Sequence, residues 1–247
     1  MNAKSASLLI LCLAFSVLIS AGSASEIKTP LLVWDIDFNS DPVDKPPQPM
    51  TKEQIENQQN DIIASLPFKT YSKIEYLTAT RRAIVMKEAA GLKDQPALFV
   101  YEEATQPHYG PRMWCQVPNE LAKAAKSWRL AFDVSKGNIE KSGGVILRDV
   151  VGIRFFEDGT LRAGSTELAR YTANKPLRLE FVIDVSGKTT VITVNGKTES
   201  AVTIPWEKPG ASSFTAVTFD GLLPGGHAFA PSTVAFDNIK LVMEEKK

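Results

Sequence analysis

The chain has 247 residues, and its 28 basic and 28 acidic side chains give a formal net charge of +0. A balanced charge offers no electrostatic attraction to nucleic acid or to acidic lipid, so neither is expected as a partner. With 44% hydrophobic residues, the chain can bury a full core, as single β-rich domains of this size do.

The first 25 residues are typical of a secretory signal peptide. Lys4 precedes the apolar stretch LLILCLAFSVLI, and the small residues of SAGSAS follow it. The apolar stretch is short for a membrane span, so a retained N-terminal anchor is the less favoured alternative. We therefore expect a secreted or periplasmic protein with no membrane contact after cleavage, whose mature part is one domain over residues 26–247.

Cys115 is the only cysteine that remains after cleavage, so no internal disulfide can form. We expect Cys115 to be a buried small hydrophobic residue rather than a reactive thiol. The stability of the domain then depends on its core or on a bound ion.

The alternating stretch at residues 33–38 predicts the first strand. Its apolar residues face the core, whereas Asp35 and Asp37 point outward. The proline-rich stretch after it cannot join a sheet, because proline removes ladder donors. Residues 51–66 then predict a short helix that begins with capping-box spacing. We expect residues 43–70 to form a Pro-rich and helical insertion that packs on the domain.

From about residue 73 onward the pattern predicts mainly strands, among them residues 97–103, 128–135 and 213–221. Asp158-Gly159 and Asn195-Gly196 predict hairpins, since type I′ turns need residues that accept positive φ. Residues 119–127 favour a short helical connection. Many short strands with turns every eight to twelve residues indicate a two-sheet sandwich or a barrel.

The last strand has an irregularity in its middle. Apolar residues are even-numbered up to Phe236 and odd-numbered from Ile239, so the core-facing side changes at Asp237-Asn238. We interpret this change as a β-bulge.

Few residues offer catalytic chemistry. The sequence contains no nucleophile elbow, no phosphate-binding loop and no cluster of metal-binding histidines. Glu180 and Asp184 share one strand face, which in an amphipathic strand is simply the polar side. In the loop QPHYGPR, His108, Tyr109 and Arg112 could serve a lyase or a binding site, or could be an ordinary solvated loop. The protein is therefore not expected to be an enzyme, although the sequence leaves this open.

The order of these elements resembles the concanavalin A-like lectin/glucanase superfamily, in the form of exported bacterial jelly-roll modules. The motifs that carry the resemblance are VGIRFFEDGTLRAG, LARYTANKPLRLEFVIDVSGKTTVITVNGK and the closing VAFDNIKL. The resemblance covers about residues 33–38 and 128–242. It implies an all-β, two-sheet antiparallel β-sandwich with the jelly-roll topology, and the helical insertion near the N-terminus is an addition to it. The laminarinase motif E-x-D-x-x-E of catalytic relatives is missing.

The resemblance also implies a structural calcium site between the first and last strands. Calcium takes six to eight oxygen ligands, and Asp35, Asp37, Asp237 and Asn238 would supply them. The alternative is that Asp237 and Asn238 bond to a neighbouring loop and shape the bulge without a metal.

The function that the resemblance implies is non-catalytic binding of a carbohydrate, with a polysaccharide or oligosaccharide as partner. The alternatives are a glycoside hydrolase or polysaccharide lyase, and a structural or interaction protein of the cell envelope. A sugar ring needs an aromatic platform and planar polar groups. Trp34 and Trp128 alternate with core residues, and Trp206 is expected to lie near a strand end, partly exposed. The candidate ligand-binding residues are Tyr109, Arg112, Trp114, Tyr171 and Trp206.

Overall fold

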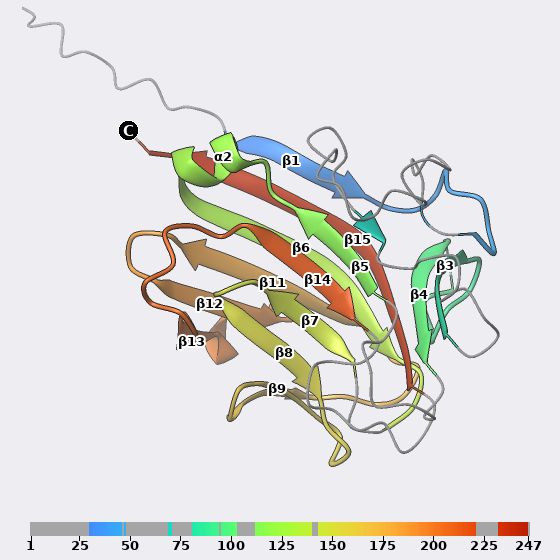
Figure 1. Ribbon diagram of the computed structural model, residues 1–247. Coiled ribbons are helices and arrows are strands. Elements are labelled where there is room, and N and C mark those ends of the chain that lie inside the picture. The colour runs from blue at the N-terminus through green and yellow to red at the C-terminus, as the bar shows by residue number, and fades with distance from the viewer. Residues whose placement is uncertain are drawn as a thin grey trace, which may run out of the picture.

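The computed structural model describes residues 30–45, 47, 69–70, 81–93, 95–102, 112–139, 143–220 and 232–246. Within these residues, two antiparallel sheets form a sandwich, so the predicted fold class is confirmed (Figure 1). The predicted helix at residues 51–66 lies outside the described part. No helix in the described ranges is long and apolar enough to cross a membrane.

The eight-stranded sheet is built around β15, the last strand. Two strands share one edge of β15: β4 pairs with its first half, up to Phe236, and β1 pairs with its second half, from Ile239. The first and last strands therefore lie side by side (Figure 1). In spatial order the sheet contains β13 (Val202–Pro205), β12 (Thr189–Val194), β11 (Leu177–Asp184), β6 (Ala125–Lys136), β15 (Ser232–Glu245), β4 (Ala97–Glu102) and β3 (Arg81–Met86), with β1 (Leu31–Ile36) as the additional partner of β15.

The seven-stranded sheet covers the other side of the core. Its spatial order is β10 (Thr166–Arg170), β9 (Thr160–Ala163), β8 (Val151–Phe155), β7 (Gly144–Leu147), β14 (Ala216–Asp220), β5 (Arg112–Gln116) and β2 (Lys69–Thr70). A single 3-10 turn, η2 (Thr198–Ser200), connects β12 to β13 in the other sheet.

Aromatic side chains from both sheets meet in the core. The ring of Phe219 on β14 packs edge-to-face against Phe132 on β6 and Phe236 on β15, with centroids 5.3 and 5.0 Å apart. Trp34 and Trp128 are 2% and 0% exposed, which confirms their predicted core positions.

The predicted turns are confirmed where the chain is described. Asp158-Gly159 connects β8 to β9, and Asn195-Gly196 follows β12 with φ angles of 53° and 69°. Both angles are positive, as a type I′ turn requires.

The helical connection predicted at residues 119–127 is shorter than expected. Helix α2 (Asn119–Ala124) ends where β6 begins at Ala125. The first residues of β6 pair with the end of β15, and these ladder bonds outweigh the helix propensity of the alanines and lysines.

Candidate functional site

The predicted bulge in β15 is confirmed. Between Asp237 and Lys240, β15 has one residue more than the facing segment of β6. Asn238 adopts a φ of 50°, in the left-handed region that asparagine tolerates better than most residues. The extra residue lets both Phe236 and Ile239 point into the core, where each is 0% exposed.

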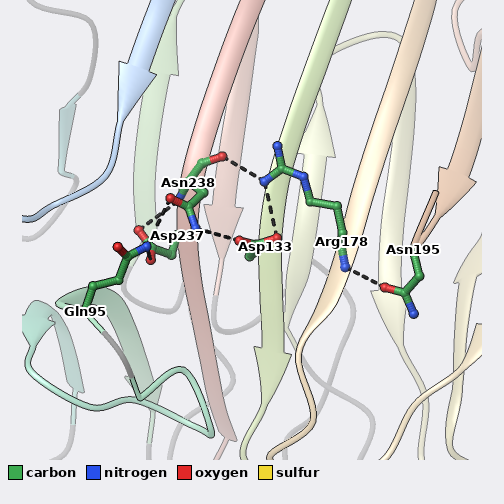
Figure 2. A network of polar contacts seen from close by, with 6 residues as sticks. All are labelled: Gln95, Asp133, Arg178, Asn195, Asp237 and Asn238. Atoms are coloured by element: carbon green, nitrogen blue, oxygen red, sulfur yellow. Dashed lines mark hydrogen bonds and ion pairs between the residues drawn. The ribbon is translucent and has the colours of Figure 1, made fainter.

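Asp237 is buried on the outer side of the eight-stranded sheet, with 1% exposure. Its Oδ2 accepts a hydrogen bond of 2.7 Å from Nε2 of Gln95, which lies in the loop before β4, and its Oδ1 accepts one of 2.7 Å from the backbone N–H of Asn238 (Figure 2). The same Gln95 nitrogen also lies 3.1 Å from Oδ1 of Asn238, so both residues hydrogen-bond to this loop, as the alternative to a metal site expects.

The network continues across the sheet to β6 and β11. Asn238 donates from Nδ2 to Oδ2 of Asp133 at 2.7 Å, and Arg178 donates from Nη1 to Oδ1 of Asp133 at 3.2 Å. The same Nη1 also donates to the backbone carbonyl of Asn238 at 3.1 Å. The backbone N–H of Arg178 donates to the side chain of Asn195, as Figure 2 shows. The side chains of β15, β6 and β11 are thus connected through the bulge.

A shallow polar depression of about 420 Å³ lies over this network. Asp35 is weakly paired with Lys240 at 3.8 Å, and both are largely exposed. The residues that line the depression are Asp35, Asp133, Arg178, Asn238 and Lys240.

Asp133 and Asp237 form the carboxylate pair that an acid–base mechanism would first suggest, because they face each other in register. Burial raises the pKa of Asp237 to about 6, the nearby carboxylates of Asp133 and Asp37 add to the rise, and the hydrogen bonds from Asn238 and Gln95 oppose it. A glycosidase needs both carboxyl groups at the substrate. Asp237 is buried and does not line the depression, so this pair is not placed for catalysis.

The second carboxylate pair, Glu180 and Asp184, is also unsuitable. The two residues lie four positions apart on β11, which separates them by about 13 Å, beyond the spacing of a glycosidase pair. Asp184 is held in the following turn, where its Oδ1 accepts hydrogen bonds from Ser186 and the N–H of Gly187, and these bonds hold its pKa below the usual range.

The residues proposed for calcium do not fit a calcium cage. Both oxygens of Asp237 accept hydrogen bonds from protein N–H groups, both oxygens of Asp37 are bonded to Asn39, and Asp35 faces Lys240. Within the described ranges, no group of three or more His, Cys, Asp or Glu side chains could hold a metal ion. A calcium ion that bound these oxygens would have to displace the N–H and ammonium groups that now face them.

Two of the aromatic residues expected to meet a ligand are in the core. Trp206 follows the end of β13, as predicted, but it is 2% exposed, so its expected partial exposure is wrong. Its Nε1 donates to the carbonyl of Thr189 at 3.3 Å, and Nζ of Lys188 lies 4.4 Å from its ring centroid. Tyr171 is 6% exposed and donates its hydroxyl to the carbonyl of Phe156 at 2.8 Å. Neither ring presents a face to solvent.

Two of the other candidates, Arg112 and Trp114, belong to β5 of the seven-stranded sheet. Met113 and Cys115 on β5 point into the core and are 0% exposed, so Trp114 between them occupies an outward position of the strand. Trp114 is partly exposed and faces Thr218 on β14 in register. Tyr109 lies outside the described residues. The prediction that Cys115 is a buried hydrophobic residue is confirmed, and burial raises the pKa of its thiol.

Three residues of the polar network, and one outside it, were not singled out from the sequence. Gln95, Asp133 and Arg178 carry no local signal, because only the strand pairing brings them to the bulge. Arg154 on β8 stands between the core residues Ile153 and Phe155, so its outward direction follows from the alternation.

Comparison with known proteins identifies the fold. No protein-family model matches the sequence, and no curated protein does. Among solved structures, a sialidase aligns with a TM-score of 0.55 at 16% identity, over 84% of this chain and 18% of the sialidase. An endo-β-1,4-glucuronan lyase from Trichoderma reesei aligns with a TM-score of 0.46 at 10% identity, over 66% of this chain and 88% of the lyase. Alginate lyase A1-II′, a member of polysaccharide lyase family 7, aligns with a TM-score of 0.42 at 9% identity, over 61% of this chain and 81% of the lyase.

These likenesses concern the fold. The chain spans less than a fifth of the length of the sialidase that it matches. The sandwich is consistent with the concanavalin A-like jelly roll that the sequence resembles.

Proposed function

We propose that this protein binds a carbohydrate, without catalysis, on the outward face of the seven-stranded sheet. The observation that carries the proposal is the position of Trp114. Of the aromatic residues that the sequence offered as sugar platforms, it is the one whose side chain is described and partly exposed on an outward sheet face.

The surroundings of Trp114 support this choice of face. Thr218 lies opposite Trp114, and Ile146 and Gly152 continue the same row across β7 and β8. A flat row of small and medium side chains beside one indole ring suits a sugar, whose apolar face stacks on the ring while its hydroxyl groups bond to polar neighbours.

The positions of the carboxylates support a role without catalysis. In the described ranges, Asp237 is buried at the bulge and Asp184 is held by the turn that follows β11. Neither of the two carboxylate pairs considered above presents both groups to one groove. Export to the periplasm or the cell exterior, proposed from the first 25 residues, would place the protein where polysaccharides occur.

The test is a glycan array on the full chain and on three variants. We expect the native protein to bind at least one glycan, Trp114→Ala to lose binding at least tenfold, and Trp114→Phe to keep most of it. Val182→Ala, which removes a partly exposed side chain from the outward face of the eight-stranded sheet, is the matched control and should bind normally.

Three outcomes would contradict the proposal. If the native protein binds no glycan, the proposed function is wrong. If Trp114→Ala binds as well as the native protein, the binding face is wrong. Release of new reducing ends from a bound glycan would show catalysis.

A further inference from the structure

Two arginine side chains face each other on the outward side of the seven-stranded sheet. Arg154 on β8 and Arg162 on β9 are register partners, and the residues on either side of each point into the core. Like charges directly opposite on neighbouring strands destabilise a sheet. This pair therefore needs a compensating negative charge.

A neighbouring carboxylate compensates the charge of Arg162. Its guanidinium is paired with Asp158 in the turn between β8 and β9, its Nε donates to Oγ1 of Thr160 at 2.7 Å, and it covers the ring of Phe156 with 4.7 Å to the centroid. These contacts draw Arg162 along its own strand toward the turn.

No carboxylate is paired with Arg154 in the described residues. The side chain of Arg154 is partly exposed, and within the described part of the chain no hydrogen bond, ion pair or ring contact involves it. The carboxylate of Glu207 accepts the backbone N–H of Gly152 at 2.9 Å, and within the described residues no ion pair joins it to Arg154. Asp220, further along the sheet, is 0% exposed.

Glycines flank Arg154 on two sides. Gly144 is its register partner on β7, and Gly152 precedes it by two positions on the same face. Gly144 is required by the backbone, since its φ is 150° and a Cβ there would lie 2.0 Å from the carbonyl oxygen of Ile153. Neither glycine projects a side chain beside Arg154, while Gly144 is itself buried and Oε1 of Glu207 lies over Gly152.

We propose that Arg154, with Arg162 beside it, binds an acidic group of the glycan, so that the ligand is an anionic oligosaccharide. This inference rests on the proposed function and names the class of its ligand. The planar fork of an arginine binds a carboxylate or a sulfate ester through two parallel N–H donors. An anion at this position also supplies the compensating negative charge that Arg154 lacks.

The position of Arg154 relative to Trp114 sets the size of the ligand. The row that contains Trp114 reaches Gly152 after crossing β14 and β7, which is three strand spacings or about 14 Å. Arg154 follows Gly152 on the same face. One sugar unit is too short to contact both residues, so the ligand is an extended chain.

The experiment measures affinity by calorimetry for three probes: a hexuronic acid oligomer, the same oligomer with its carboxyl groups methyl-esterified, and an oligomer of uncharged sugars that carries sulfate esters. We expect the native protein to bind at least one acidic probe at least tenfold more tightly than the methyl-esterified oligomer. This preference should be lost as salt is added. The preferred probe identifies carboxylate or sulfate as the recognised group.

Variants test whether Arg154 causes the preference for the acidic probe. Arg154→Gln should reduce the affinity for the acidic probe about tenfold and leave the affinity for the methyl-esterified oligomer unchanged. Arg154→Lys should keep part of the preference, because it keeps the charge and loses the fork. Arg170→Gln is the control, since Arg170 is an exposed arginine on β10 of the same sheet.

The outcomes separate this inference from the proposed function. If the acidic and methyl-esterified probes bind equally well and Trp114→Ala weakens both, the inference of an acidic ligand is wrong. The proposal of carbohydrate binding then stands. An acidic preference that survives Arg154→Gln would overturn the assigned residue. If neither these probes nor any glycan of the array binds, both proposals are wrong.

Discussion

Asp237 on β15 lies directly opposite Asp133 on β6, and Asn238 donates a hydrogen bond to each of the two carboxylates. Two negative charges on facing positions repel each other. Asn238 and Arg178 offset the repulsion from one side, and Gln95 does so from the other. The bulge of the last strand is thus the point at which three strands and a loop are held together.

The first prediction concerns pH. The pKa of Asp237 is about 6 in the folded protein, against an ordinary value of 3.8, so the folded state binds this proton more tightly than the unfolded state. The resulting stabilisation is fully present below about pH 4 and is lost as the pH rises through 6. It should amount to about 2–3 kcal/mol, measured by urea unfolding between pH 4 and 7.5.

Asp237→Asn is the control for this pH dependence. The amide keeps an oxygen for the N–H of Asn238 and does not titrate. The native-minus-variant difference in unfolding free energy should therefore decrease between pH 4 and 7. A difference that does not vary with pH would contradict the raised pKa.

The second prediction separates the two roles of Asn238. Asn238→Gly should cost about 1 kcal/mol, because it removes the hydrogen bond to Asp133 while glycine accepts the φ of 50°. Asn238→Ala should cost about 1 kcal/mol more, since alanine is strained at that angle. Thermal unfolding of both variants gives the comparison, and equal losses would show that backbone strain does not matter here.

The third prediction concerns metal. Because the oxygens of Asp237 and Asp37 already accept protein hydrogen bonds, removal of calcium with a chelator should leave the melting temperature unchanged. Added calcium should not raise it either. A melting temperature that falls in chelator, with the fall abolished in Asp237→Ala, would establish the calcium site instead.

The fourth prediction concerns Trp206. Trp206→Ala should destabilise the fold by about 3–5 kcal/mol, because it leaves a cavity under the end of β13. Trp206→Phe should cost much less, as it loses mainly the hydrogen bond to Thr189. Neither variant should lose glycan affinity while folded. Selective loss of binding by folded Trp206→Phe would place Trp206 at the ligand.

Much of the fold could be predicted from the sequence. The alternation of Trp128 with its neighbours located a core strand, and Asn195-Gly196 located a hairpin. The change of core-facing side at Asp237-Asn238 located the bulge. These features depend on the side-chain period of a strand and on the φ preferences of single residues, which are local properties.

The partners of these residues could not be predicted in the same way. Gln95 reaches Asp237 across 142 positions of the chain, and Trp206 is buried because a strand end folds onto the sandwich rather than because of its neighbours in sequence. Alternation showed that Arg154 points outward, but not that Arg162 faces it. Local dihedral preferences determine strands and turns, whereas burial and cross-strand partners follow from sheet order and register, which are set by packing over long sequence separations. The sequence by itself therefore determined that this protein is built of strands with a bulge in the last one, and only the tertiary structure decided that hydrogen bonds hold the bulge and that two arginines meet on the opposite sheet.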